Sequence, residues 1–213
     1  MWATNNPSKL WTPGRTLTIA FLNGTQEAKD IIIAAASNWL PHINLNFDFV
    51  EGRAGDIRIH CDAGAFFSAV GTDALLHDEG ATMQLGSHLA ERPRFFAANV
   101  MHEFGHMLGA EHEQTHPLAD IPWDLSTIYE SHGLPDDPDE DDELTRSKRD
   151  WLHDLYIDCA DPEDSIYSGY DRKSVMHYFI PQSWTEGDFQ NLLNLELSDN
   201  DKAFMAKAYP YPV

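Results

Sequence analysis

A string of eleven residues, HEFGHMLGAEH at positions 102–112, constrains this chain more than any other feature. In an α-helix, residues four apart lie on one face, so His102 and His106 can direct their imidazoles at a common ion. A straight helix would carry His112 away from that ion. The chain must therefore turn sharply where the helix ends, and Gly109 tolerates the positive φ of such a turn. The string predicts a metal site with three histidine ligands.

Glu103 stands beside this ligand set and need not belong to it. Zinc lowers the pKa of a bound water to roughly 7, and a neighbouring carboxylate can accept the water's proton and later deliver it to a leaving amine. The pattern thus indicates a metal-dependent hydrolase with one catalytic zinc ion. Ordinary histidines on a surface helix are the alternative, which is disfavoured because the pattern specifies five of eleven positions.

A second motif, SVMHY, occupies residues 174–178. Together with the histidine string it resembles the metzincin metallopeptidases, in which a methionine lies in a tight turn beneath the zinc ligands. The resemblance assigns Met176 to that turn as an apolar floor. It is closest to the astacin branch, because Glu113 directly follows the third histidine and Tyr178 falls two residues after the methionine. By resemblance, Tyr178 is a fifth metal ligand that swings away to stabilise the oxyanion of the transition state, and His177 stays outside the zinc shell.

Glu113 has two interpretations. In mature astacins the equivalent acid contacts the N-terminal ammonium in a buried cavity, and this chain starts about ten residues before Trp11, which is a similar lead. A supporting role beside the site is favoured over that contact, because the bulky Trp2 disfavours trimming of Met1.

The resemblance covers most of the chain, from LWTPGRTLTIAF through DIRIHC and ATMQLG to ELSDNDKAFMAKAYP. It implies an α+β, zincin-like fold in a single catalytic domain, residues 1–213. An upper lobe (about 1–108) would hold a twisted mixed sheet with an antiparallel edge strand and the active-site helix, and a mostly irregular lower lobe (about 109–213) would end in a helix. Astacins typically carry more cysteines, joined in disulfides, whereas Cys61 and Cys159 are expected to be reduced thiols.

Hydrophobic periodicity places most of the expected elements. Alternating apolar residues predict strands at 16–21, 45–50 and 57–61. Helices are expected from the N-cap Thr25 to Pro41 and over residues 94–108, 123–132, 144–156 and 198–208. In the last of these, Asp199 and Asp201 suit the helix dipole, and Ala203, Phe204 and Ala208 are expected to pack inward.

A short stretch between two glycines, formed by Ala81, Thr82, Met83, Gln84 and Leu85, is expected to be the edge of the sheet above the active-site helix. By resemblance to astacins, a substrate peptide would lie antiparallel to this edge. Main-chain hydrogen bonds would then give affinity, and side-chain pockets would give selectivity. A merely solvated edge is the alternative.

The formal net charge of −21 disfavours binding to nucleic acid or to anionic membranes, and no apolar run approaches the roughly 20 residues needed to cross a bilayer. Residues 135–143 contain seven acids and predict a solvated loop rather than a calcium site. If this loop overhangs the cleft, it favours basic substrates. No Lys or Arg occurs from Ser174 to Asp201, so the preference of several astacins for an acidic residue after the scissile bond is not expected.

These observations predict a monomeric zinc endopeptidase that hydrolyses internal bonds of peptides or proteins, with Glu103 activating a zinc-bound water and Tyr178 stabilising the oxyanion. The alternatives are a zinc hydrolase dedicated to one peptide or small amide, and a latent module that only binds peptides. The start of the chain, MWATNNPSKLW, has neither the basic region nor the apolar region of a secretory signal. A cytoplasmic or leaderless protein is therefore expected unless a leader has been removed, although astacins are often secreted.

Overall fold

The computed structural model describes residues 1–4, 6–61, 64–86, 92–135, 137 and 142–212. It contains a five-stranded mixed sheet, a separate two-stranded antiparallel pair, and five α-helices among the described residues. The α+β class expected from the sequence is confirmed. No disulfide joins Cys61, which is buried, to Cys159, which is exposed. No helix in the described part of the chain is long and apolar enough to cross a membrane.

Three neighbouring parallel strands form one side of the sheet. β2 (Thr16–Phe21) lies between β3 (Asn46–Glu51) and β4 (Ile57–Cys61). The alternation in β2 buries Leu17 and Ile19 completely. The predicted strands are confirmed, with β3 displaced by one residue.

The edge of the sheet differs from the prediction. β6 (Met83–Leu85) pairs in parallel with β4 on one side and antiparallel with β5 (Phe67–Ser68) on the other. β5, and not residues 81–85, is therefore the terminal strand at this end of the sheet, and β3 ends the other side. Met83 and Leu85 are fully buried, which suits an inner strand. The assignment of Ala81, Thr82, Met83, Gln84 and Leu85 to the edge was therefore wrong. β5 was missed because it is only two residues long and has no alternating pattern of its own.

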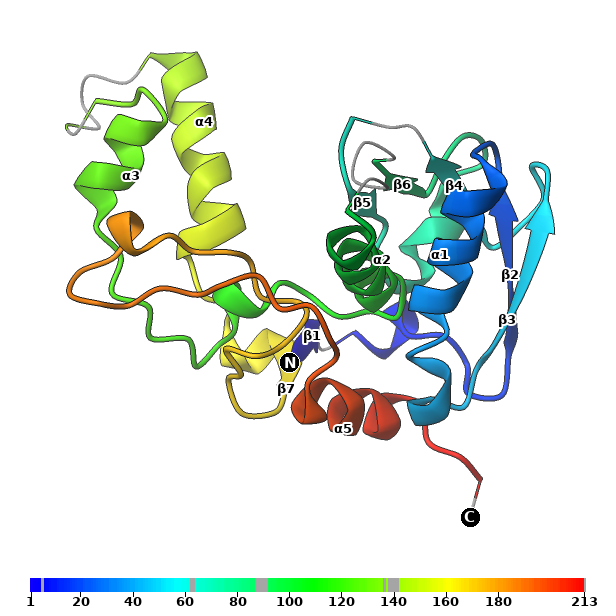
Figure 1. Ribbon diagram of the computed structural model, residues 1–213. Helices are drawn as coiled ribbons and strands as arrows, with labels where there is room; N and C mark the ends of the chain where they lie inside the picture. The colour runs from blue at the N-terminus through cyan, green and yellow to red at the C-terminus, as the bar shows by residue number, and fades with distance from the viewer. Residues whose placement is uncertain (5, 62–63, 87–91, 136, 138–141, 213) are drawn as a thin grey trace.

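Two helices lie beside one another on the sheet (Figure 1). α1 (Gln26–Ala36) begins at Thr25, whose hydroxyl accepts a hydrogen bond from the backbone N–H of Ala28 at 3.2 Å. It ends earlier than Pro41, and a short 3-10 turn follows. α2 (Pro93–Met107) contains the histidine string. The buried indole of Trp39 donates to the carbonyl of Met101 at 3.0 Å and ties the end of α1 to α2.

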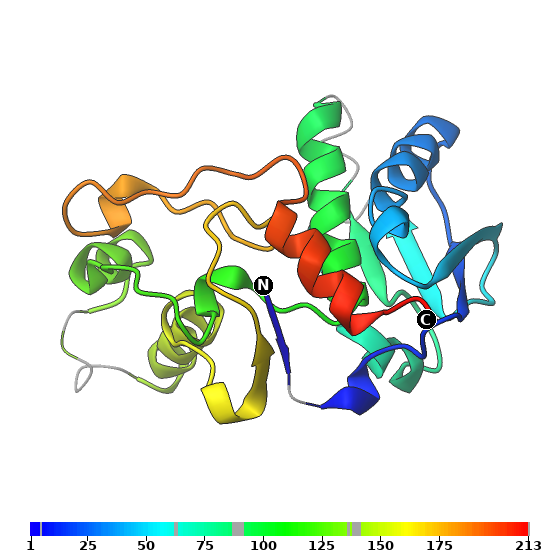
Figure 2. The same cartoon turned by 90° about the horizontal axis from the view of Figure 1, so that it is seen from below.

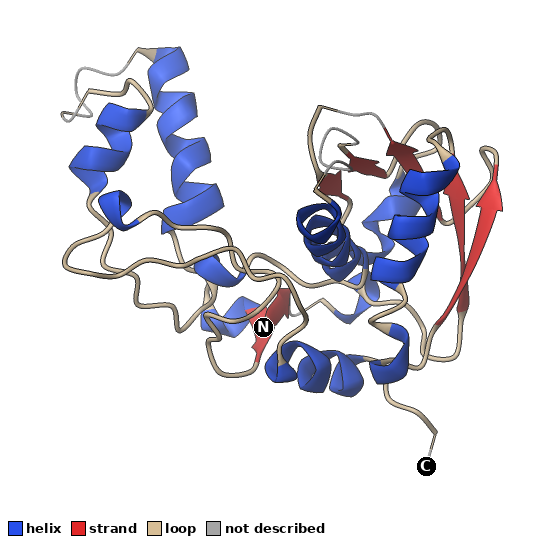
Figure 3. Cartoon of the chain, in the orientation of Figure 1, coloured by secondary structure: helices blue, strands red, loops and turns tan. Residues whose placement is uncertain are grey.

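The second half of the chain is mostly loop (Figure 3). α3 (Leu125–Ser131) and α4 (Glu143–Leu152), which continues into a π-helical turn (His153–Ile157), have an apolar cluster of their own. The acidic run 135–143 lies largely outside the described residues. Among the described residues, the short 3-10 helices are Pro7–Lys9, Leu40–His42, Gly71–Leu76, Glu113–Thr115, Pro162–Asp164 and Gln182–Trp184.

The N-terminus is built into the fold. β1 (Trp2–Thr4) pairs antiparallel with β7 (Ser165–Tyr167), and α5 (Asp199–Ala208) crosses the underside of the molecule close to it (Figure 2). Ser198 and Asp201 form a capping box at the start of α5. Phe204 is buried as expected, but Ala203 is exposed, and Met205 packs inward in its place.

Candidate active site

α2 and the turn that ends it bring the three histidines of the string together. The Nε2 atom of His106 lies 3.1 Å from Nε2 of His102 and 3.0 Å from Nε2 of His112. The turn depends on Gly109, whose φ of 94° carries the chain back from the helix end, as predicted. An added Cβ there would also lie 2.6 Å from Cδ2 of Leu10. The three side chains are positioned to hold one metal ion.

Backbone carbonyls orient two of these imidazoles. Nδ1 of His102 lies 2.9 Å from the carbonyl of Val175, and Nδ1 of His106 lies 2.8 Å from the carbonyl of Ala110. A carbonyl only accepts, so both Nδ1 atoms carry the hydrogen and both Nε2 atoms present lone pairs. Burial lowers the pKa of His102 to about 4 and that of His106 to about 3, and it lowers the pKa of His112 well below its usual value. Neutral imidazoles converging in this way match the ligands that zinc takes in proteins.

Glu103 is buried next to this cluster. It is 5% exposed, and its Oε2 has no hydrogen-bond partner among the described residues. Burial raises the pKa of its carboxyl group to about 8. A carboxyl group whose pKa is raised toward neutrality, and which has one oxygen without a partner, is suited to exchanging a proton with a reactant.

The methionine turn closes the site from below. Met176 is fully buried, and a Cβ added at Gly105 of α2 would overlap its Sδ atom. Asp201 of α5 accepts a hydrogen bond from the backbone N–H of Val175 at 2.9 Å. The carbonyl of Val175 accepts a hydrogen bond from Nδ1–H of His102. The methionine turn therefore links α5 to His102. The sequence indicated Asp201 only as a helix-dipole acid, since a capping pattern does not reveal a distant partner.

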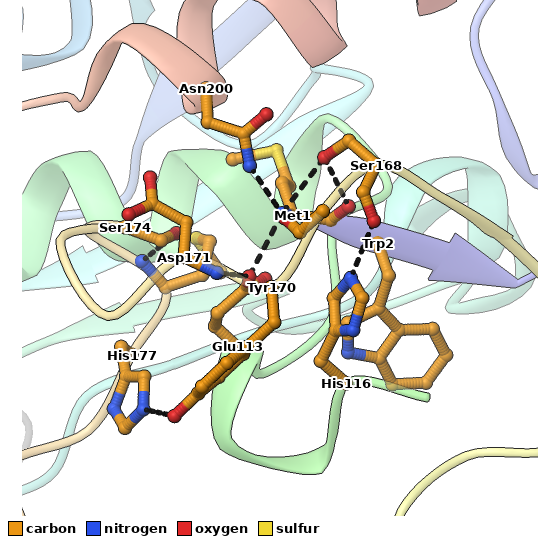
Figure 4. A network of polar contacts seen from close by, with 12 residues as sticks. Met1, Trp2, Glu113, His116, Ser168, Tyr170, Asp171, Ser174, His177 and Asn200 are labelled. Carbon is orange, nitrogen blue, oxygen red and sulfur yellow. Dashed lines mark hydrogen bonds and ion pairs between the residues drawn. The ribbon is translucent and has the colours of Figure 1, made fainter. Parts of the chain in front are cut away.

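Tyr178 lies over the third histidine, with its ring centroid 4.3 Å from that of His112. Its backbone N–H donates to Oε1 of Gln114 at 3.2 Å, and its carbonyl accepts from Nδ1 of His177 at 2.9 Å. Nε2 of His177 in turn accepts from the hydroxyl of Tyr170 at 2.8 Å (Figure 4). Both nitrogens of His177 are thus engaged away from the ligand cluster. Burial first, and then the charge of Glu103, raises the pKa of the Tyr178 hydroxyl, which keeps it a hydrogen-bond donor.

The N-terminal ammonium contacts Glu113, contrary to the interpretation favoured from the sequence (Figure 4). Met1 N lies 2.9 Å from Oε1 of Glu113, and both side chains are fully buried. The backbone N–H of Asp171 donates to the same oxygen at 2.8 Å, and Ser168 Oγ lies 3.2 Å from the ammonium. Burial raises the pKa of Glu113 to about 7, and the ammonium opposes that rise. The argument from the bulk of Trp2 concerned only whether Met1 is removed. With Met1 in place, its ammonium lies in the cavity beside Glu113.

Trp2 also supports the third ligand, which the sequence did not indicate. Its indole Nε1–H donates to the carbonyl of His112 at 2.7 Å, and its own carbonyl accepts from the backbone N–H of Glu111 at 3.0 Å. The N-terminal strand therefore holds the segment that carries His112.

Two cavities flank the cluster, and both are lined by Phe66, Glu103 and Tyr178. We call the first the Glu111 pocket. It has a volume of about 220 Å³, and its walls also include Phe67, Ser68, Val70, His106, Glu111 and His112. We call the second the Asn194 pocket. It has a volume of about 180 Å³, and its walls also include Ala98, Asn99, Val175, Phe179, Leu193 and Asn194.

Solved structures share this architecture. One structure of myroilysin matches with a TM-score of 0.85 and 29% sequence identity over 100% of both chains. A crystal structure of myroilysin matches with a TM-score of 0.71 and 32% identity over 96% of this chain and 87% of the other. High choriolytic enzyme 1, a hatching enzyme zinc-protease from the medaka fish Oryzias latipes, matches in fold with a TM-score of 0.62 and 14% identity, over 94% of each chain. No protein-family model and no curated protein matched the sequence.

The mixed sheet, the active-site helix and the three converging histidines above a buried methionine define a zinc metalloprotease of the metzincin class. The chain belongs to the astacin-like zinc metalloendopeptidases of that class, and this confirms the resemblance drawn from HEFGHMLGAEH and SVMHY.

Proposed function

We propose that this protein hydrolyses internal peptide bonds with one zinc ion held by Nε2 of His102, His106 and His112, and with Glu103 as the general base. The observation that carries the proposal is the meeting of these nitrogens beside the buried carboxyl group of Glu103, whose Oε2 has no hydrogen-bond partner among the described residues. When bound, zinc supplies a Lewis acid that polarises the scissile carbonyl and makes a water more acidic. The protease relatives support peptides or proteins as substrates.

The side chains would divide the proton and charge transfers between them. Glu103 takes a proton from the attacking water at its carboxylate as the water oxygen bonds to the carbonyl carbon. It then delivers that proton to the amide nitrogen as the carbon–nitrogen bond breaks, which yields a carboxylic acid and an amine. The acid then loses its proton to the amine, and the products leave as a carboxylate and an ammonium. The hydroxyl of Tyr178 donates a hydrogen bond to the oxyanion that forms between these steps. No covalent bond to the protein is required.

The substrate would bind along β5, the antiparallel strand that ends the sheet. No described strand pairs with the outer edge of β5, so its backbone groups are available to an extended peptide. We propose that the peptide lies antiparallel to β5, because antiparallel pairing forms the more stable hydrogen-bond pattern. Phe67 is 50% exposed on this edge and offers an apolar contact.

Loss of one ligand tests the metal. His106→Ala is expected to bind zinc far more weakly, because it removes the nitrogen that lies nearest both other ligands. Zinc content would be measured after dialysis, and cleavage of a diverse peptide library would be read by mass spectrometry with zinc-loaded and chelated wild type. Cuts made only by the zinc-loaded wild type would support an endopeptidase. Stoichiometric zinc in the variant would refute the ligand assignment. If only one peptide in the library were cleaved, a hydrolase dedicated to one substrate would be favoured. If no peptide were cleaved, a module that only binds peptides would be favoured.

Removal of the Tyr178 hydroxyl tests its role. Tyr178→Phe is expected to lower kcat by about 10²-fold while KM changes little, since the lost hydrogen bond is made only in the transition state. Steady-state kinetics on a single-cut peptide would measure both constants. Tyr156→Phe is a matched control, because the Tyr156 ring lies 5.6 Å from that of Tyr178 but outside both pockets. An equal loss in both variants would contradict the assignment.

A further inference from the structure

The two pockets beside the proposed active site differ in charge. Glu103 lines both of them, but the Glu111 pocket contains a second carboxylate, whereas the Asn194 pocket contains no other Asp or Glu and no Lys or Arg. This difference bears on which substrate side chains each pocket accepts, so the inference rests on the proposed peptidase function.

The walls of the Glu111 pocket suit a long side chain with a cationic end. Phe66, Phe67 and Val70 provide apolar surface, and Glu111 provides the acid. Lys and Arg bury an aliphatic stem against apolar groups while their charged end seeks a counter-charge. A water occupies about 30 Å³ of liquid, so a cavity of about 220 Å³ corresponds to about seven waters and can hold such a side chain.

The carboxylate of Glu111 has no bonded partner in the described part of the protein. Its side chain makes no hydrogen bond or ion pair with the described residues, although its backbone N–H is bound by Trp2. Lys9, whose charge acts on Glu111, is already paired with Asp73 at 2.7 Å. A cationic group that enters the pocket would therefore meet a carboxylate without a partner.

The direction of β5 relates each pocket to one side of the scissile bond. Phe66, which precedes β5, lines both pockets, whereas Phe67, Ser68 and Val70 line only the Glu111 pocket. The chain thus proceeds along this edge toward the Glu111 pocket. A peptide antiparallel to β5 would place the residues that precede its scissile bond near Val70. We propose that Glu111 selects Lys or Arg at the position immediately before the scissile bond.

Paired peptides test the proposal directly. Three peptides would differ only before the cleaved bond, with Lys, Arg or the uncharged norleucine, and kcat/KM would be measured for zinc-loaded wild type, Glu111→Gln and Glu79→Gln. The ratio of Lys to norleucine is expected to exceed about 10 in wild type and to fall about tenfold in Glu111→Gln. Glu79→Gln removes one exposed acid outside both pockets and should keep the wild-type ratio. Zinc content is measured for each variant, because Glu111 adjoins His112.

The outcomes separate this inference from the proposed function. Equal ratios in wild type and Glu111→Gln would overturn the inference while leaving the peptidase function intact. A preference for Lys at the position after the scissile bond would overturn the assignment of the Glu111 pocket to the residue before that bond. If no peptide is cleaved, the proposed function fails, and binding of the Lys and norleucine peptides, measured by calorimetry, still decides the inference. Tighter binding of the Lys peptide by wild type but not by Glu111→Gln would support the pocket, and equal binding would overturn it.

Discussion

Glu103→Gln is expected to lower kcat by about 10³-fold or more while zinc remains bound. Gln retains the volume of Glu and its carbonyl oxygen, but it cannot accept a proton from water or deliver one to the leaving amine. Glu103 is 5% exposed and its Oε2 contacts no other described polar group, so this oxygen is not committed to another contact. Steady-state cleavage of a single-cut peptide and zinc content per chain would measure the two effects.

The control for this variant is Glu196→Gln, which removes an exposed acid on the loop before α5. It should leave both kcat and zinc content unchanged. Zinc loss from Glu103→Gln would make this residue a ligand and not a base. Residual activity within about tenfold of wild type would show that another group transfers the proton.

Glu113→Gln is expected to destabilise the protein by about 3–5 kcal/mol, the typical cost of removing one partner from a buried ion pair. The carboxylate of Glu113 and the ammonium of Met1 are both fully buried at 2.9 Å. Gln leaves the ammonium with a neutral acceptor and brings an additional donor beside the backbone N–H of Asp171. Urea unfolding of the zinc-free protein would measure the difference without a contribution from metal binding.

Glu130→Gln serves as the matched control, because Glu130 is exposed on α3 and a surface change of this kind usually stays within about 0.5 kcal/mol. A loss of less than about 1 kcal/mol in Glu113→Gln would contradict the buried pair. Because β1 also holds the carbonyl of His112 through Trp2, the same variant should weaken zinc binding.

Local patterns determined the elements that form the site. Apolar alternation located β2, and the i, i+4 spacing located the face of α2 that carries His102 and His106. Gly109 marked the helix-ending turn because only a residue without a side chain adopts φ of 94° without strain. Spacing and chemistry sufficed here because neighbours along the chain share one helix face or one turn.

Contacts between distant segments were decided by the tertiary structure alone. β5 is the edge strand on the side of β6 because β6 is paired on both sides, and no pattern within either short strand encodes that order. The Met1–Glu113 pair, the bond from Trp2 to His112, and the support of Val175 by Asp201 join residues that are far apart in sequence. Such partners are chosen by how the sheet, the helices and the long loops pack. The sequence by itself therefore determined which histidines converge and which acid lies beside them, whereas packing decided what supports these residues and which strand ends this side of the sheet.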